Sequence, residues 1–588
     1  DVSILWLGLG VVASGLVALL LMGIYGVIIR YLDTRAAAHL AVGAAAATSA
    51  WFVLAFVSRI EGLPRSVGFI YFGLLFMLMF FGRLIASHLL VEMAPVARAN
   101  EGEEPVPQKG VAICGATATG CAVAETLRRD PQYNLLFFVD DDPEVVGRKM
   151  MGVSVRTQRE LRRAVKAGKV QQVLLAMPTS TRAERLSIMS SLADLSVSVM
   201  TVPAYEEIIG GRATVSDLRP VKVEDLLRRD VVPPKDDLIA QGIAGNSILI
   251  TGAGGSIGSE ICRQVLRYGP AQMVLLDHSE FAIYSIESEL RAMLALEPEL
   301  KRPELVPLIG SLLNEQLVKS ALERYRIDTV FHAAAYKHVP LLEHNEVIGV
   351  QNNVIGTKRL ADACVAAKVS NMTMISTDKA VRPTNVMGSS KRMAELYVQA
   401  LANLPDVPTK FGIVRFGNVL DSSGSVVQQF RLQIEQGGPV TVTHPDITRF
   451  FMSIPEATQL VLQANALATG GEVFVLDMGE PVRIAELART MITLSGMSER
   501  SDANPDGDIE ITYVGLRPGE KLHEELFVGD DIEPTAHPQI KMARERWLDF
   551  DELELLVSRL KRALAAYDAQ QVRSLLKEVL EPEHRQAA

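Results

Sequence analysis

The sequence is poor in the residues that mark disulfide-bonded, metal-bound or nucleic-acid-binding proteins. Its 588 residues include four cysteines, Cys114, Cys121, Cys262 and Cys364. Their spacing fits neither a disulfide scaffold nor the paired C-x-x-C pattern of a zinc site, so we expect reduced and mostly buried thiols. The formal net charge is -10 and no basic stripe is present, which argues against binding to nucleic acid.

Metal-ligand motifs are missing as well. His332, His338 and His344 recur at a regular interval, but their spacing matches neither H-E-x-x-H nor a zinc finger. His523 is followed by two glutamates and lacks the second histidine of such a motif. We therefore interpret these histidines as ordinary polar or packing residues and predict no metal site.

Hydrophobic residues, in contrast, are abundant at 48% of the chain, and the mean hydropathy is positive. Apolar runs cover residues 4–29, 40–57 and 67–90, the last with Arg83 near one end. Their length predicts about three transmembrane helices within residues 1–96. A buried helical hairpin is the alternative for the two weaker runs. A cleaved signal peptide is disfavoured because the first run is long and lacks a basic leader.

The chain is too long for a single core, so several folded units are expected after the apolar region. Residues 97–109, with a run of glutamates and two prolines, predict a polar linker. Residues 110–203 alternate predicted strands and helices, which indicates a small Rossmann-like α/β domain, and residues 204–240 form a connector. The glycine loop of this domain has Thr117 in place of its middle glycine. A structural or regulatory role is therefore favoured over a dinucleotide site.

A stronger nucleotide-binding signal begins at residue 247. An apolar strand runs into Gly252-Ala-Gly-Gly-Ser-Ile-Gly258, whose glycines allow a tight turn and close approach of the backbone to phosphates. The next strand ends at Asp277, where a carboxylate can bind the ribose hydroxyls of NAD and repel the 2'-phosphate of NADP. A glycine turn that only packs a helix on a strand is the alternative. The predicted cofactor contacts in this stretch are Gly252, Gly254, Gly255, Ser256, Ile257, Gly258 and Asp277.

Four motifs together carry a resemblance to a known family. They are Thr251-Gly-Ala-Gly-Gly-Ser-Ile-Gly-Ser-Glu260, Ala333-Ala-Ala-Tyr-Lys-His-Val-Pro340, Ser376-Thr-Asp-Lys-Ala380 and Val414-Arg-Phe-Gly-Asn-Val419. The chain resembles the bacterial membrane-bound polysaccharide-biosynthesis dehydratases, which are extended short-chain dehydrogenase/reductases that act on UDP-N-acetylglucosamine. The resemblance covers the whole chain. Because that family usually has four membrane spans, it implies one more span ahead of Asp1.

The resemblance implies a fold and a reaction. An extended short-chain dehydrogenase domain with a smaller substrate-binding subdomain is expected over residues 241–545. C-terminal helices follow over residues 546–588, where apolar residues recur at helical spacing. The implied reaction is the NAD-dependent 4,6-dehydration of UDP-N-acetylglucosamine to UDP-2-acetamido-2,6-dideoxy-4-hexulose, for surface polysaccharide or glycan synthesis. In it C4 is oxidised, water is lost across C5 and C6, and the hydride returns to C6.

Five residues are expected to carry this chemistry. By resemblance, Asp378 is the acid for the C6 hydroxyl and Lys379 the base for the C5 proton. A solvated Asp–Lys pair on a loop is the plain alternative. The Tyr-x-x-x-Lys pair of ordinary dehydrogenases is replaced here by Met387-Gly-Ser-Ser-Lys391. Methionine cannot accept a proton, so the C4 proton must leave through Thr377 or a water, while Lys391 remains to bind the nicotinamide ribose.

Further contacts follow from the same resemblance. Ala333 and Ala334 would lie beside the cofactor. Arg449 offers a cation for the diphosphate, and Arg517 would bind near the uridine, although a lone arginine on a loop is more commonly a solvated charge. The expected substrate contacts are Lys337, His338, Asn418, Ser425, Thr443, Arg449, Arg517 and Glu520.

Two other functions stay open from the sequence. A nucleotide-sugar 4-epimerase would need only oxidation and reduction at C4, but Met387 and the Asp378–Lys379 pair count against it. A non-catalytic, nucleotide-sensing membrane scaffold is disfavoured by the intact glycine loop and Lys391. The expected partners are a UDP-sugar, the lipid bilayer and a second copy of the chain in a homodimer. The expected location is the bacterial inner membrane, with the catalytic domains in the cytoplasm.

Overall fold

The computed structural model describes residues 34–57, 66–99, 108–128, 130, 132–177, 188, 197–201, 219–220, 232–502, 504–527, 532–545 and 548–585. The backbone divides into two compact units, residues 1–109 with 127–134 and residues 110–126 with 135–588. The apolar run over residues 4–29 lies outside the described residues.

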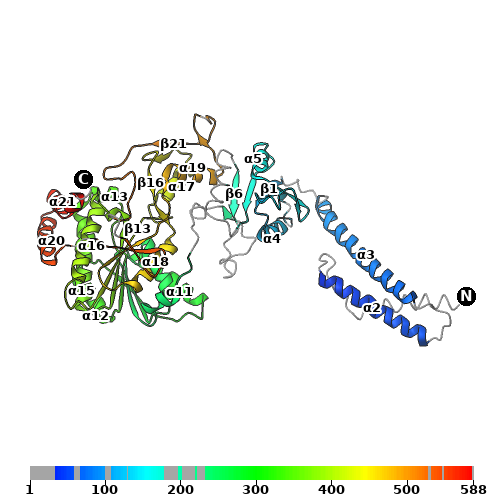
Figure 1. Ribbon diagram of the computed structural model, residues 1–588, viewed down its shortest axis with the longest axis horizontal. Helices are drawn as coiled ribbons and strands as arrows, with labels where there is room; N and C mark the ends of the chain where they lie inside the picture. The colour runs from blue at the N-terminus through cyan, green and yellow to red at the C-terminus, as the bar shows by residue number, and fades with distance from the viewer. Residues whose placement is uncertain are drawn as a thin grey trace. The chain divides into compact units, whose positions relative to one another are not determined.

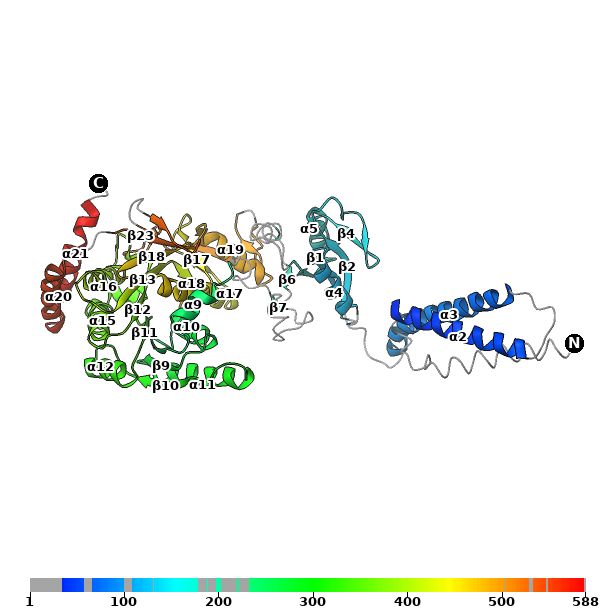
Figure 2. The ribbon, with the colours of Figure 1, turned by 60° about the horizontal axis from the view of Figure 1, so that its bottom comes forward.

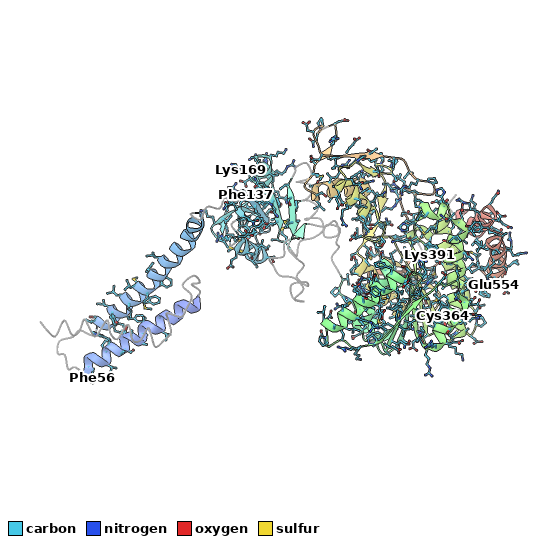
Figure 3. All side chains as sticks on the ribbon, turned by 180° about the vertical axis from the view of Figure 1, so that it is seen from behind. Phe56, Phe137, Lys169, Cys364, Lys391 and Glu554 are labelled. Atoms are coloured by element: carbon cyan, nitrogen blue, oxygen red, sulfur yellow. The ribbon has the colours of Figure 1, made fainter. Side chains whose placement is uncertain are left out.

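The first unit contains two long helices, α2 (Thr34–Val57) and α3 (Ser66–Ala99) (Figure 1). They pack through Trp51 of α2, which is buried and whose ring lies 5.8 Å from the ring of Tyr71 on α3. The hydroxyl of Thr48 donates to the carbonyl of Ala44 at 2.8 Å, so this polar side chain is satisfied within α2. Phe56, labelled in Figure 3, is exposed.

The prediction of transmembrane helices is wrong for the part of the chain that the structure describes. Within the described ranges no helix combines the length and the apolarity that crossing a lipid bilayer requires. Alanine dominates α2, and its single methyl group buries little apolar area in lipid.

A seven-stranded sheet with two described helices forms the first α/β part of the second unit. Its elements are β1 (Lys109–Cys114), α4 (Ala118–Leu127), β2 (Tyr133–Val139), β3 (Lys149–Met150), β4 (Val153–Arg156), α5 (Gln158–Lys166), β5 (Gln172–Leu175), β6 (Ser198–Thr201) and β7 (Arg219–Pro220). The strand order is β3-β4-β2-β1-β5-β6-β7, with parallel pairing from β1 to β5 and from β5 to β6. The predicted Rossmann-like alternation of strands and helices is confirmed.

A nine-stranded sheet forms the larger α/β part. Its strands are β8 (Ser247–Thr251), β9 (Gln272–Asp277), β10 (Glu304–Ile309), β11 (Thr329–His332), β12 (Asn371–Thr377), β13 (Lys410–Phe416), β18 (Glu472–Leu476), β22 (Ile532–Pro534) and β23 (Ile540–Ala543). The order is β10-β9-β8-β11-β12-β13-β18-β23-β22. Among the described strands of this sheet, β23 pairs antiparallel with β18 and with β22, and the other pairings are parallel. The strands β10-β9-β8-β11-β12-β13 have the 3-2-1-4-5-6 order of dinucleotide-binding sheets. The order reverses between β8 and β11, where ligands bind in such folds.

Helices cover both faces of this sheet (Figure 2). They are α9 (Asp236–Gln241), α10 (Ser256–Arg267), α11 (Glu280–Leu296), α12 (Glu315–Arg324), α13 (Val339–Glu343), α14 (Glu346–Val350), α15 (Thr357–Ala366), α16 (Val386–Ala402) and α18 (Ile454–Leu467). α10, α11 and α18 share one apolar core, and α12, α15 and α16 share the other. Because side chains alternate along a strand, β11 gives Val330 to one core and Phe331 to the other.

Short strands and two helices form a smaller part beside the carboxyl end of the large sheet. They are β14 (Asn418–Val419), α17 (Val426–Glu435), β15 (Val440–Val442), β16 (Thr448–Arg449), β17 (Phe451–Met452), β19 (Val482–Arg483), α19 (Ile484–Leu494), β20 (Glu499–Arg500) and β21 (Ile509–Tyr513). A separate apolar core with Phe430, Leu487 and Ile492 holds them together. The domain boundaries given in the sequence analysis stay predictions.

The predicted C-terminal helical pair is confirmed as α20 (Phe550–Ala565) and α21 (Ala569–Arg585). Leu553 and Leu560 of α20 and Leu576 of α21 are buried in the same core as α16. The two helices therefore extend the core on one face of the large sheet.

A network of buried ion pairs connects β12 and β13 to α16. Glu395 of α16 accepts hydrogen bonds from Arg415 Nε at 2.8 Å and lies 3.2 Å from Arg392 Nη1. Both arginines also contact Glu545, and Ser376 donates its hydroxyl to Glu395. Burial opposes the charge on Glu395, but Arg415 and Arg392 hold its pKa below the usual value. The network therefore links the end of β12 to the helix behind it.

Candidate active site

The glycine-rich loop between β8 and α10 has the backbone shape of a dinucleotide site. Gly252 has a φ of +68°, and a Cβ there would lie 2.7 Å from the backbone nitrogen of Ala334. A Cβ on Gly258 would lie 1.9 Å from the Gly252 carbonyl oxygen. Gly255 is the N-cap of α10, and within the described residues no side chain caps that turn. Its first N–H groups are thus left for an anion.

Asp277 ends β9 and faces the same loop. Its Oδ2 accepts a hydrogen bond from the Gly254 N–H at 3.1 Å, and its Oδ1 accepts one from the Ser279 N–H at 3.0 Å. Because each carboxylate oxygen has a further lone pair, Asp277 can brace the loop and still accept from ribose hydroxyls. The loop and the carboxylate therefore fit NAD, with its pyrophosphate at the start of α10 and its adenosine ribose at Asp277.

Replacing Asp277 with alanine is expected to reduce the preference for NAD over NADP by roughly tenfold or more. The variant loses the acceptor for the ribose and the charge that repels the 2'-phosphate. Calorimetric titration with each cofactor measures the change, and Asp237→Ala on the exposed surface of α9 is the control. Equal affinity of the wild type for both cofactors would contradict this role of Asp277.

The loop after β11 continues the cofactor side of the site. Ala333 and Ala334 lie beside the glycine loop. The next turn is held by Asn353, whose side chain accepts from the Tyr336 N–H at 2.9 Å and donates to the Tyr336 carbonyl at 3.0 Å. Asn353 is buried in a π-helical turn, Gln351–Gly356, a form that is frequent at functional sites. Asn353 could not be singled out from the sequence, because no local motif marks it.

The predicted acid and base come together at the carboxyl end of β12. Asp378 Oδ1 accepts from Thr377 Oγ1 at 2.8 Å and from Lys379 Nζ at 2.9 Å. Lys379 Nζ also donates to Asn418 Oδ1 at 2.9 Å. Asp378 is fully buried, and its Oδ2 has no hydrogen-bond partner among the described residues. An amine, a hydroxyl and a carboxylate oxygen are thus arranged for proton transfer to a ligand.

Met387 and Lys391 lie one turn apart on α16, and both are buried. Lys391, labelled in Figure 3, donates from Nζ to the Ile375 carbonyl at 2.7 Å. Burial lowers the pKa of Lys391 to about 8. Because methionine has no ionisable group, this lysine has no tyrosine to activate at position 387. The expected contact of Lys391 with the nicotinamide ribose stays a prediction.

His332 has the packing role expected from the sequence. Its two ring nitrogens bond the hydroxyls of Thr251 and Thr357 at 2.8 and 2.9 Å. Burial, together with the charge of Lys391, lowers the pKa of His332 to about 3, so the ring stays neutral. All four cysteines are free, and three are buried, as predicted. The described residues contain no group of three or more side chains that could hold a metal.

Glu520 forms hydrogen bonds with residues predicted to bind the diphosphate and the uridine. Its Oε1 accepts from Arg449 Nη2 at 3.2 Å and from Thr443 Oγ1 at 3.4 Å, and its Oε2 accepts from the Arg517 N–H at 3.1 Å. Arg449 is buried and also donates to the Thr448 carbonyl at 2.7 Å. The side chain of Arg517 is exposed. The structure therefore brings these residues together around one carboxylate.

Lys337 and His338 are both exposed on the loop after β11. The His338 ring packs over Gly424, because a Cβ at Gly424 would lie 2.5 Å from its Cε1. This contact joins the loop after β11 to the loop before α17. His338 is thus a neighbour of the loop that carries Ser425, another of the predicted substrate contacts.

The loop over residues 422–425 also meets the cofactor loop. The Ser423 N–H donates to Ser256 Oγ, at the start of α10, at 3.2 Å. Ser425 is the N-cap of α17 and accepts from the backbone of that helix. The loop that carries the predicted substrate contact Ser425 is therefore bonded to the turn predicted to bind the cofactor phosphates.

One acidic residue of this region was missed from the sequence. The side chain of Glu524 is 5% exposed, and its Oε1 lies 3.9 Å from Arg449 Nε. Its Oε2 is buried without a hydrogen-bond partner in the part of the chain that the structure describes. Burial raises the pKa of Glu524, and the attraction of Lys379 only partly offsets this effect. In the sequence, Glu524 stands out only as part of the incomplete metal motif after His523.

A polysaccharide biosynthesis protein family matches residues 248–545, just over half of the chain. The chain belongs to this family. The resemblance inferred from the four sequence motifs is thereby confirmed. A second match, described as a CoA-binding domain, covers residues 2–203 of this polysaccharide biosynthesis protein.

Relatives of this polysaccharide biosynthesis protein carry different names. The capsular polysaccharide biosynthesis protein CapD of Staphylococcus aureus is 43% identical over 440 residues, which cover 74% of this chain and 71% of the relative. A UDP-glucose 4-epimerase of Rickettsia canadensis is 33% identical over 287 residues, 49% of this chain and 79% of the relative. A solved dTDP-glucose 4,6-dehydratase of Streptomyces venezuelae with NAD bound is 22% identical, covers 47% of this chain and 87% of its own, and has a TM-score of 0.40. The glycine loop and Asp277 of this polysaccharide biosynthesis protein fit NAD as the cofactor.

Proposed function

We propose that this protein is a nucleotide-sugar 4,6-dehydratase that converts UDP-N-acetylglucosamine to UDP-2-acetamido-2,6-dideoxy-4-hexulose for polysaccharide synthesis. The observation that supports this most directly is the Asp378–Lys379 pair at the end of β12, where the amine and the carboxylate are 2.9 Å apart. Loss of water needs a proton taken from C5 and a proton given to the C6 hydroxyl. An adjacent base and acid suit both transfers.

The proton steps can be written for the side chains of this site. When bound, NAD accepts the hydride of C4 and returns it to C6. Thr377 receives the C4 hydroxyl proton and passes its own to the Asp378 carboxylate, to which it donates at 2.8 Å. Neutral Lys379 takes the C5 proton, and Asp378 gives its proton to the C6 hydroxyl, which leaves as water. Lys379 then returns a proton to C5, so both groups end as they began.

The same proposal assigns the cluster around Glu520 to the nucleotide. Arg449 supplies a cation for the diphosphate, while Thr443 and Arg517 frame the uridine end. Since Arg449 is paired with Glu520 at 3.2 Å in this structure, diphosphate binding has to compete for this guanidinium. Asn418 holds Lys379 Nζ at 2.9 Å and thereby fixes the base next to the sugar.

A 4-epimerase is the second candidate, because the Rickettsia canadensis relative bears that name. It would oxidise and reduce C4 without touching C5 or C6. Met387 is evidence against an epimerase, because the usual tyrosine that takes the C4 proton is absent at this position of α16.

Deuterium at C4 of the substrate separates the two functions. A dehydratase is expected to deliver the label to C6 of the same molecule, because the hydride waits on the nicotinamide between the two transfers. In heavy water it is expected to place solvent deuterium at C5, because Lys379 exchanges with solvent. NMR of the product measures both positions, with unlabelled substrate in light water as the control. Return of the label to C4 with an untouched C5 would establish the epimerase instead.

A further inference from the structure

The start of α16 lies directly against the backbone of the proposed base. A Cβ on Gly388, in the first turn of this helix, would lie 3.0 Å from the carbonyl carbon of Lys379 and still closer to its carbonyl oxygen. A side chain does not fit at this point, so the helix turn and the Lys379 backbone are in contact only because residue 388 is a glycine. A shift of this turn would therefore also move the residue that carries the amine.

Two side chains hold that first turn in place. The first N–H groups of a helix have no partner within the helix. In α16, Asn385 Oδ1 accepts from the Gly388 N–H at 2.8 Å, and Glu343 Oε1 accepts from the Val386 N–H at 2.7 Å. Asn385 is the N-cap of α16 itself, whereas Glu343 is the last residue of α13. Glu343 is therefore a support that reaches the helix from a different element.

The chain just ahead of α16 has supports of its own. The Gly519 carbonyl accepts from Thr384 Oγ1 at 2.9 Å and from Asn385 Nδ2 at 3.0 Å. Lys521 Nζ donates to the Val381 carbonyl at 2.9 Å. These bonds fix the turn that follows the catalytic pair, but they do not include the first N–H of the helix.

Glu343 is itself held by the C-terminal helix α21. Arg573 Nη2 donates to Glu343 Oε2 at 3.0 Å and to the Glu343 carbonyl at 3.0 Å. It also donates to Glu346 Oε1 of α14 at 2.7 Å. α13 and α21 both pack beside α16 (Figure 1). One carboxylate oxygen of Glu343 thus accepts the helix N–H, while the other is held by an arginine more than two hundred residues away in sequence.

We propose that Glu343 is a positioning residue that keeps Lys379 aligned with C5 of the sugar by holding the first turn of α16, and that Arg573 keeps the Glu343 carboxylate in place. This inference rests on the proposed dehydratase function and deepens it. The negative charge of Glu343 also suits the positive end of the α16 dipole. The C-terminal helices then serve the active site, although they contribute no residue to the chemistry.

The first measurement compares two glutamates that share Arg573 and are 16% and 17% exposed. Because a displacement of about 1 Å can cost on the order of 100-fold in rate, Glu343→Ala is expected to lower kcat by about tenfold to 100-fold. KM should stay near the wild-type value. Glu346→Ala is the matched control and should keep the wild-type kcat, because in the described structure the Glu346 side chain has no bond to α16. A kcat of Glu343→Ala no lower than that of Glu346→Ala would overturn the proposal.

A conservative variant tests the route of the effect. Glu343→Gln keeps a side-chain oxygen that can accept from the Val386 N–H. It is therefore expected to recover most of the kcat that Glu343→Ala loses. A kcat as low as that of Glu343→Ala would overturn the proposed route through this bond.

The absorbance of the cofactor shows which step is slowed. C4 is oxidised before Lys379 acts on C5, so a displaced amine should leave reduced nicotinamide waiting for the elimination. Stopped-flow absorbance is expected to show NADH accumulating in Glu343→Ala above the level of the wild type and of Glu346→Ala. A slower reaction without this accumulation would place the defect in the first hydride transfer and overturn a role of Glu343 at Lys379.

Hydrogen exchange tests the support without the reaction. In Glu343→Ala the Val386 N–H loses its acceptor, so amide exchange at the start of α16, measured by mass spectrometry, should become faster. Glu346→Ala should leave it unchanged. Faster exchange in Glu343→Ala together with no dehydration by the wild type would support the hold on α16, and the dehydratase function would fail alone. Dehydration by the wild type with unchanged exchange in Glu343→Ala would overturn the role of Glu343 alone.

A shorter carboxylate decides the matter if Glu343→Ala does not fold. Glu343→Asp keeps the charge that faces Arg573, but its side chain is one methylene shorter and draws the acceptor back from the Val386 N–H. It is expected to have a lower kcat and more accumulated NADH than Glu346→Asp. Equal values for the two aspartate variants would overturn the proposal.

Discussion

Asp378→Asn and Lys379→Ala are each expected to lower turnover by about 100-fold to 10,000-fold, the usual loss for a single general acid or base. Asp378→Asn removes the group that carries a proton to the C6 hydroxyl, and Lys379→Ala removes the amine that takes the C5 proton. NAD binding should persist, because the glycine loop and Asp277 are left intact. Single-turnover kinetics and cofactor titration on the same samples measure the two effects separately.

A surface lysine provides the control for this experiment. Lys319 on α12 is half exposed and pairs only with Glu315 among its described neighbours, so Lys319→Ala should leave turnover unchanged. The isotope pattern sharpens the result, since Lys379→Ala should also stop the exchange of the C5 proton with solvent. Unaltered turnover in both site variants would remove the proposed acid and base roles.

Glu395→Ala is expected to reduce the free energy of unfolding by about 3–5 kcal/mol, because it leaves two buried arginines with one carboxylate instead of two. Arg415 is fully buried and Arg392 nearly so, and both contact Glu395. Glu545 alone would then face two guanidinium groups. Urea unfolding followed by circular dichroism gives the difference from the wild type.

An exposed ion pair gives the comparison for this stability prediction. Arg559 and Glu578 join α20 to α21 at 2.7 Å, but both side chains are largely exposed. Glu578→Gln should therefore cost at most about 1 kcal/mol. A Glu395→Ala variant as stable as Glu578→Gln would show that the buried network contributes little to folding.

Local sequence predicted the strand–turn–helix geometry around the glycine loop. The glycine loop, the start of α10 and the acid at the end of β9 lie within about thirty residues, and strand–turn–helix geometry alone brings them together. Asp378 and Lys379 were also foreseeable, since they follow an apolar strand whose carboxyl end must face the ligand side of a parallel sheet. Hydropathy misjudged α2 and α3, because apolar content along a run does not by itself give the apolar length of a span.

Long-range pairing could not be predicted from the sequence. Arg449 and Glu520 were taken as separate contacts to a substrate, whereas they form one ion pair across 71 residues. Glu524 was missed because its place beside Arg449 depends on bonds from residues 519–523 to two distant loops. Asn353 was missed for the same reason, since its partner Tyr336 is reached only through the π-helical turn.

The bond between Ser423 and Ser256 bears on the exchange of the cofactor. It joins the loop that carries Ser425 to the first residue of α10, where the pyrophosphate of NAD is proposed to bind. A dehydrogenase that ends each cycle with reduced cofactor has to open such a contact to let it out. Here the hydride is returned within the cycle, so NAD is regenerated in place. A loop that is hydrogen-bonded to the cofactor-binding turn therefore need not lower the turnover rate. A tightly retained cofactor becomes compatible with repeated turnover.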